Sequence, residues 1–227
     1  MNIDFHCHLL PGVDDGCKTL EESLRIINEM KTKGVEKIIL TPHLYSPKVP
    51  TNMNKIIDTF KETREHFLKA GIEVELGAEI FLREKLSSKP LLPLGRSRYL
   101  LIELPDFEPA YLFEELLELQ KKDYYIVLAH VERYVYLFSD PSSKRGFFRT
   151  KFAPGKLLKL KEMGVFFQVN WNSLICKDKR AQYLLKNGLL DFISSDKHGL
   201  KDGRYIIDFR SKFLEELKID EPAFGGA

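Results

Sequence analysis

The chain has 227 residues, 44% hydrophobic and 11% aromatic, which is enough to bury a core and suits one domain over residues 1–227. Its 35 basic and 33 acidic residues leave a net charge of +2, which gives no case for a nucleic-acid partner or a membrane surface. The three cysteines have no paired spacing and predict neither a disulfide framework nor a CxxC zinc site.

The start of the chain and its apolar runs bear on where the protein works. The first predicted strand begins at residue 3, which leaves no room for a signal peptide. No apolar run is long enough to span a bilayer. We therefore expect a cytoplasmic protein with no membrane span.

The first third of the chain alternates short apolar strands with helices. Thr19 and Glu22 form a capping box that begins a helix, and Gly34 closes it as a left-handed residue would. In order, we predict a strand from residue 3, a helix over 19–34, a strand over 35–40, a helix over 53–70 and a strand over 73–78.

The same alternation continues after a loop-like stretch at 81–97, which contains two prolines. We predict strands over 99–102, 124–129, 165–169 and 189–193, and helices from about Pro109 and over 154–163, 178–187 and 204–217. Seven strands result, and only the third is followed by a loop. This pattern favours parallel strands buried on both faces, as in a closed or nearly closed (β/α)7 barrel. A doubly wound open sheet is the alternative, but no GxGxxG follows the first strand.

Side chains able to bind metals stand where the predicted strands end. They are His6 and His8, with Asp15 in the loop beyond, then His43, Glu79, Glu103, His130, Asp196 and His198. In a parallel barrel these ends converge on one rim, where active sites lie. His66, in the middle of a helix, is better interpreted as an ordinary helix residue.

The number of candidate ligands indicates more than one ion, because a zinc site uses four. Five neutral histidines and four carboxylates carry a formal charge of −4, so two divalent ions would balance them and three would leave +2 for a phosphate dianion. Nitrogen and oxygen donors together suit manganese, iron, cobalt or zinc. Such clusters lower the pKa of bound water from about 16 toward about 7, which predicts hydrolysis by a metal-activated hydroxide.

Seven ordered motifs between residue 1 and about 210 carry a family resemblance. They are DFHCH with LLPGVDDG, TPH at 41–43, GAEIFL at 77–82, LIEL at 101–104, AHVERY at 129–134, QVNWNSL at 168–174, and SSDKH followed by DGR. The chain resembles the PHP (polymerase and histidinol phosphatase) superfamily of metal-dependent phosphoesterases. It is most similar to the bacterial manganese-dependent protein-tyrosine phosphatases of capsule and exopolysaccharide operons, the CpsB/YwqE type.

The resemblance implies three divalent ions. It favours manganese as the metal, with iron, cobalt or zinc as alternatives. The first would be held by His6, His8, Glu79 and Asp196, the second by Glu79, His43 and His130, and the third by Asp15, Glu103 and His198. Arg133 and Arg204 match family arginines that grip phosphate, for which a guanidinium fork is well suited. The implied partner is a tyrosine-phosphorylated protein, the tail of a bacterial tyrosine kinase, and a homo-oligomer is allowed.

Two segments depart from the family pattern. Residues 135–155 form a longer connection, rich in basic and aromatic residues, which we interpret as a rim loop for phosphopeptides, a partner surface or a covered loop. The C-terminal residues 220–227 stand where the family has a further Asn-Pro helix, which leaves barrel closure and oligomer contacts open.

Other functions compete with this hypothesis. A histidinol-phosphate or other small-molecule phosphatase would share all nine ligands. An amidohydrolase barrel also starts with HxH but carries a carboxylated lysine where Glu103 stands, and a PHP nuclease would need a basic groove. A non-catalytic phosphotyrosine-binding scaffold is the alternative from another class. A cysteine phosphatase is excluded, because the positions that Cys-x5-Arg requires, 13, 23 and 182, hold Val, Ser and Gln.

Overall fold

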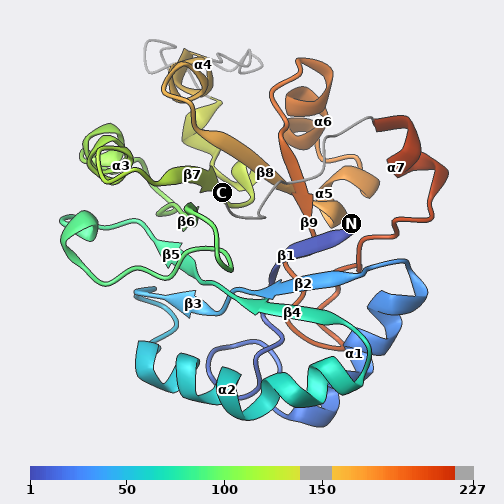
Figure 1. Cartoon of the computed structure of the whole chain (residues 1–227). Helices are drawn as coiled ribbons and strands as arrows, with labels where there is room; N and C mark the ends of the chain where they lie inside the picture. The colour runs from blue at the N-terminus through green and yellow to red at the C-terminus, as the bar shows by residue number, and fades with distance from the viewer. Residues whose placement is uncertain (139–154, 218–227) are drawn as a thin grey trace.

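The structure, a computed structural model, describes residues 1–138 and 155–217, with side chains as far as residue 214 (Figure 1). Its strands are β1 (Ile3–Cys7), β2 (Lys37–Leu40), β3 (His43–Leu44), β4 (Glu73–Leu76), β5 (Glu79–Phe81), β6 (Tyr99–Glu103), β7 (Tyr125–Leu128), β8 (Phe166–Asn170) and β9 (Phe192–Ser194). Its α-helices are α1 (Leu20–Thr32), α2 (Met53–Lys69), α3 (Leu112–Gln120), α4 (Gly155–Glu162), α5 (Trp171–Ile175), α6 (Lys179–Lys186) and α7 (Lys212–Leu217). Among these helices, none is long and apolar enough to cross a membrane.

All the strands pair in parallel and curl into a partial barrel with helices outside (Figure 1). The order is β1-β2-β4 in one sheet and β3-β5-β6-β7-β8-β9 in the other. The predicted α/β class is confirmed, with a curled parallel sheet. Nine strand segments replace the seven predicted strands, because the second and third are each interrupted, after Leu40 and after Leu76. The (β/α)7 count therefore stays a prediction.

The first and last strands of the curl meet. Cys7 forms an isolated parallel bridge with Lys197, and the Asp196 N–H donates to the His6 carbonyl over 2.8 Å. The Ser194 hydroxyl and the Ser195 N–H both donate to Oδ1 of buried Asp4, over 2.5 and 3.1 Å. These contacts place β1 and the end of β9 side by side at the site.

A β-bulge in β1 explains how His6 reaches the inside of the curl. Asp4 pairs with Ile38 and Cys7 with Leu40, so β1 holds one residue more than β2 between these pairs. Phe5 belongs to the interior cluster with Leu101 and Val127, while Cys7 is buried in the outer cluster. A bulge redirects side chains, and here it allows both Phe5 and its neighbour His6 to lie inside the curl.

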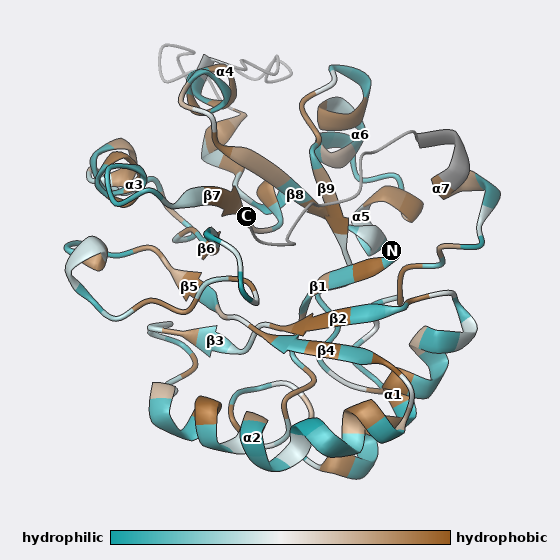
Figure 2. Ribbon diagram, in the orientation of Figure 1, coloured by the Kyte–Doolittle hydropathy of each residue, from teal (hydrophilic) through white to brown (hydrophobic). Residues whose placement is uncertain are grey.

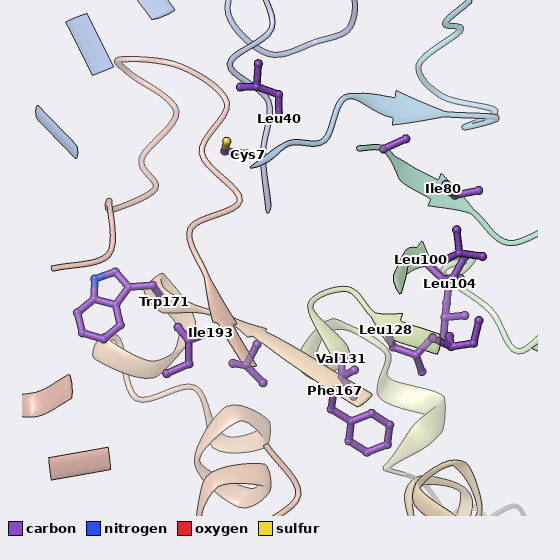
Figure 3. Packing of buried hydrophobic residues seen from close by; sticks show 14 of the residues in the cluster. Cys7, Leu40, Ile80, Leu100, Leu104, Leu128, Val131, Phe167, Trp171 and Ile193 are labelled. Atoms are coloured by element: carbon purple, nitrogen blue, oxygen red, sulfur yellow. The ribbon is translucent and has the colours of Figure 1, made fainter. Parts of the chain in front are cut away.

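Most of the core lies between the sheet and the surrounding helices. The residues labelled in Figure 3 come from successive strands and from the helical turns beside them, and they form one continuous apolar layer. In Figure 2 a central strand such as β8 is mostly hydrophobic, whereas α2 alternates hydrophobic and hydrophilic residues. Burial of both sheet faces is what parallel strands require.

Several predicted boundaries hold. The side chain of Thr19 caps α1 by accepting from the Glu22 N–H over 3.2 Å, and Gly34 has a φ of +85°. The Glu22 carboxylate, however, accepts from Lys18 rather than from the cap residue, so the capping box is shifted by one position. The third strand is followed by a loop, as predicted, with one 3-10 turn over Leu86–Ser88.

The predicted helix over 204–217 is largely wrong. Only Lys212–Leu217 is helical, because Ile206 and Ile207 are buried in the core without regular secondary structure and the Phe209 N–H donates to the Lys33 carbonyl. The last strand begins at Phe192 rather than residue 189, and α3 begins at Leu112 rather than Pro109. Helix α5 was not predicted. The 135–155 connection lies mostly outside the described residues, and the 220–227 segment wholly so.

Candidate metal centre

The structure brings all nine predicted ligands together inside the curl, on the side where the strands end. Their donor atoms fall into four groups, in each of which all donors lie within 4.8 Å of one another. The groups are His6, His8 and Asp196; His6, Glu79 and His130; His43, Glu79 and Glu103; and His8, Asp15, His43 and His198. Every neighbouring pair of groups shares a residue, so the nine side chains form one cluster.

Separations at the centre of the cluster are those of donors that share a cation. His6 Nε2 lies 3.4 Å from Glu79 Oε1 and 3.5 Å from Asp196 Oδ1, and His8 Nε2 lies 3.4 Å from Glu79 Oε2. Two donors about 2.1 Å from one ion at tetrahedral angles are about 3.4 Å apart. These pairs are therefore too far apart for good hydrogen bonds but well placed for a shared metal.

The rim of the cluster is divided differently from the three sets implied by the family resemblance. Asp15 Oδ1 lies 3.5 Å from both His43 Nε2 and His198 Nε2, whereas Glu103 groups with His43 and Glu79. Glu79 belongs to two groups, as a bridging carboxylate would. His43 and His130 do not share a group, nor do Asp15 and Glu103.

Unsatisfied polar atoms test whether these residues fit metal ions. Within the described residues, five buried side-chain atoms of the cluster have no aligned hydrogen-bond partner: Nε2 of His6 and of His8, Nδ1 of His43, and Oε2 of Glu79 and of Glu103. Of these atoms, His43 Nδ1 and Glu79 Oε2 lie 2.9 Å apart without the alignment of a hydrogen bond. Leaving a buried polar group unpaired costs about 1–3 kcal/mol. A concentration of such atoms, all of them good nitrogen or oxygen ligands, fits divalent cations.

Neighbouring side chains hold three of the imidazoles through the ring nitrogen that faces away from the cluster. His8 Nδ1 lies 2.8 Å from Asp14 Oδ2, His6 Nδ1 lies 3.1 Å from Gln168 Oε1, and the hydroxyl oxygen of Tyr134 lies 3.1 Å from His130 Nδ1. Such partners fix the tautomer and orientation of metal-binding histidines. They leave Nε2 of each ring directed at the carboxylates.

Sequence analysis missed these supporting residues. Gln168 and Asn170 end β8 with a spacing of two, the same signal that identified the histidines and acids, but they are neutral and were passed over. Asn170 Nδ2 donates to Asp196 Oδ2 over 2.9 Å. Asp14 stands beside the predicted ligand Asp15, and its Oδ2 also accepts from the His43 N–H over 3.1 Å.

Charge and burial shift the pKa values of the cluster in opposite directions. Burial opposes ionisation of Glu79, yet the surrounding histidines, His6 first, hold its pKa well below the usual value. Burial and then the nearby Glu79 charge raise the pKa of Glu103 to about 7. Burial and then His8 lower the pKa of His198 to about 3. A bound cation would favour the neutral form of an imidazole, and it would offset the repulsion between the crowded carboxylates.

Both predicted phosphate-binding arginines approach Asp196. Nη1 of Arg133 lies 3.7 Å from Asp196 Oδ2 and Nη1 of Arg204 lies 3.7 Å from Oδ1. The Arg204 guanidinium also contacts His198 Nδ1. The Arg133 side chain is 52% exposed, so solvent reaches it although it approaches the buried Asp196.

Backbone strain marks the same place. His130 has a φ of 34° and Asp196 a φ of 54°. Non-glycine residues rarely adopt this left-handed region, and such strain concentrates at functional sites.

Comparison with known proteins agrees with this geometry. A family model described as "Capsular polysaccharide synthesis, CpsB/CapC" matches residues 2–211. Tyrosine-protein phosphatase CpsB of Streptococcus pneumoniae is 30% identical over 97% of this chain and 96% of its own, and tyrosine-protein phosphatase YwqE of Bacillus subtilis is 29% identical over 98% and 85%. A solved structure from work on YwqE and CpsB, described there as unique metal-dependent tyrosine phosphatases, matches with a TM-score of 0.79. It is 27% identical and covers 96% of this chain and 88% of that one.

Proposed function

The chain belongs to the CpsB/CapC family of capsular polysaccharide synthesis, and on this basis we propose that it is a metal-dependent protein-tyrosine phosphatase. The observation that carries the proposal is the convergence of five histidines and four carboxylates, with five buried donor atoms that lack hydrogen bonds. The curated relatives named tyrosine-protein phosphatases support phosphotyrosine as the substrate.

We assign the nine ligands to three divalent cations, with manganese as the native metal. The formal −4 of the ligands then becomes +2, which suits a phosphate dianion. When bound, such ions lower the pKa of water and stabilise negative charge on phosphoryl oxygens. The two-group membership of Glu79 supports a bridging role for its carboxylate.

The chain's own residues bind and orient the phosphate ester. Arg133 and Arg204, one on each side of Asp196, supply forked N–H donors for two phosphate oxygens. Asp14, Gln168 and Tyr134 keep the imidazoles turned toward the cluster. The leaving phenolate has a conjugate acid of pKa about 10, so it departs without a dedicated proton donor more readily than an alkoxide would.

The physiological substrate is proposed as the phosphorylated tail of a bacterial tyrosine kinase that controls capsule or exopolysaccharide synthesis, in the cytoplasm. The family's link to capsular polysaccharide supports this context. A homo-oligomer is compatible with it. We treat residues 1–227 as one catalytic domain, since the family match runs through nearly all of the described chain.

Substrate comparison tests the proposal. Manganese-loaded protein is offered a phosphotyrosine peptide, the matching phosphoserine peptide and histidinol phosphate, and phosphate release is measured. We expect kcat/KM to be highest for the phosphotyrosine peptide, and to fall at least about tenfold in Arg133→Ala, which removes a charge-assisted contact to phosphate. Preference for histidinol phosphate would replace the proposal with a small-molecule phosphatase. Tight phosphopeptide binding without turnover would make the protein a scaffold.

A further inference from the structure

A cavity of about 370 Å³ opens beside the candidate metal centre, between the segment that follows β3 and the end of β5. Strands β3 and β5, which carry the candidate ligands His43 and Glu79, also lead into the lining of the cavity. His43 pairs in register with Glu79, and two positions further along β5, Phe81 pairs with Glu103 and lines the cavity. On the other side, the hydroxyl of Thr51, another lining residue, donates to the His43 carbonyl over 2.6 Å.

The walls of this cavity are mostly apolar. Tyr45 and Phe81 are half-buried, and Pro47 and Pro50 complete the wall on the β3 side. The Tyr45 hydroxyl donates to the Pro90 carbonyl over 2.7 Å, which holds the ring in place. A preformed wall of this kind suits the stem of a side chain or a short stretch of peptide.

The one charged residue in the lining of this cavity, Arg83, is positive. None of the residues that line the cavity is acidic, and Arg83 is exposed at its edge. Within residues 1–138 and 155–214, no carboxylate forms an ion pair with Arg83. Lys89 adds a second cation, with its Nζ 5.5 Å from the centre of the Tyr45 ring.

A second cavity on the outer face shows the contrast. It lies between α2 and β4, and its lining holds two arginines, Arg64 and Arg96, and two glutamates, Glu73 and Glu75, so the formal charges of the lining cancel. Of these two cavities, the one beside the metal centre combines nearness to the candidate ligands with a lining whose only charge is positive.

We propose that the cavity lined by Tyr45, Phe81 and Arg83 is a specificity subsite that receives an acidic side chain next to the phosphotyrosine. This inference rests on the proposed function. A neighbouring residue is one Cα step of about 3.8 Å from the phosphotyrosine, within reach of a cavity that begins two positions beyond Glu79. Arg83 pairs with the carboxylate, and the apolar wall packs against its stem. The aryl ring carries no negative charge to match the cations.

The test compares two phosphotyrosine peptides that differ only in the residues flanking the phosphotyrosine, glutamate in one and glutamine in the other. Wild type, Arg83→Gln and the matched control Arg96→Gln are assayed with manganese, together with p-nitrophenyl phosphate. We expect wild type and Arg96→Gln to favour the glutamate peptide by about fivefold, through KM, as one partly exposed ion pair allows. Arg83→Gln loses this preference, and all three proteins hydrolyse p-nitrophenyl phosphate equally.

A binding experiment separates this proposal from the proposed function. Non-hydrolysable phosphonate versions of both peptides are titrated against the three proteins, and affinity is read from fluorescence anisotropy. A preference for glutamate that disappears only in Arg83→Gln supports the subsite even in a protein without turnover. A preference that survives in Arg83→Gln, or no preference in wild type, overturns it. An equal loss on p-nitrophenyl phosphate would place the aryl ring in the cavity and also overturn it.

Discussion

Gly16 lies so close to His8 that one added carbon would displace the histidine. A Cβ built at Gly16 would stand 2.0 Å from the His8 carbonyl oxygen and 2.6 Å from the His8 Cβ. The Gly16 N–H also donates to Oδ1 of Asp14, whose other oxygen orients the His8 imidazole. Gly16 therefore fixes the distance between the loop after β1 and the metal centre.

Replacing this glycine should damage both stability and metal binding. We expect Gly16→Ala to lower the free energy of unfolding by about 2 kcal/mol, the usual cost of forcing atoms into a packed region, and to reduce bound manganese. Gly155→Ala is the matched control, because no atom of residues 1–138 and 155–217 lies within 4 Å of its added Cβ. Urea unfolding and metal analysis of both variants give the result. If Gly16→Ala kept the stability and metal content of wild type, the loop after β1 would be able to shift without cost, and this prediction would be wrong.

Glu132 is a buried acid whose charge should make stability depend on pH. Burial raises its pKa to about 7, from an ordinary 4.5, although its Oε1 accepts from the Asn170 N–H over 3.1 Å. The folded protein therefore holds a proton there that the unfolded chain releases. The stability that comes from this proton is complete below pH 4.5 and is lost as the pH rises through 7.

Glu132→Gln removes this titration but keeps an oxygen for the Asn170 N–H. In metal-free protein, we expect the variant to gain about 2 kcal/mol relative to wild type between pH 5 and pH 8. Chemical unfolding at the two pH values measures the difference, with exposed Glu62→Gln as control. The same difference at both pH values would mean that Glu132 does not titrate in this range.

One buried carboxylate, that of Asp4, adds side-chain hydrogen bonds to the backbone contacts between β1 and β9. Oδ1 of Asp4 accepts from the Ser194 hydroxyl and the Ser195 N–H, and the Ser194 oxygen accepts from the Phe5 N–H over 3.1 Å. All of these groups are buried. Because β1 carries His6 and β9 leads into Asp196, the same contact sets the spacing of two candidate ligands.

Asp4→Ala should separate these strands. It leaves two buried donors unpaired, so we expect a loss of about 2–4 kcal/mol in the free energy of unfolding. Asp4→Asn keeps an acceptor oxygen at the same place, and its loss should be clearly smaller. Denaturant unfolding of the two variants gives the comparison. Equal losses would assign the effect to the negative charge instead of the hydrogen bonds.

Local patterns predicted most of the elements, and they failed where distant contacts decide the structure. Thr19 and Gly34 bound α1 through their own capping chemistry, which the sequence displays. The sequence predicts a helix over residues 204–211, but Ile206 and Ile207 are buried in the core without regular secondary structure. The break after Leu40 leaves β3 only two residues long, paired with β5, which depends on partners far along the chain.

The overall architecture makes the location of the site easier to predict than the way its ligands group around each ion. Parallel strands deliver their last residues to one rim, so the strand ends and the loop after the first strand located all nine candidate ligands. How those ligands group depends on register, including the bulge in β1, and no local pattern displays that. The supporting roles of Asp14, Gln168 and Tyr134 depend on their hydrogen bonds to the imidazoles, which the structure shows, although Gln168 already stands near a predicted strand end.

The cluster should bind metal and hydrolyse phosphotyrosine as one unit, since each of its groups shares a residue with another. Protein stripped by a chelator is titrated with manganese while bound metal per chain and hydrolysis of a phosphotyrosine peptide are followed in the same sample. We expect no hydrolysis without metal, and activity that rises until about three ions are bound and then stays constant. Full hydrolysis in the stripped protein, or saturation with metal and no hydrolysis, would contradict a metal-dependent phosphatase built on these nine residues.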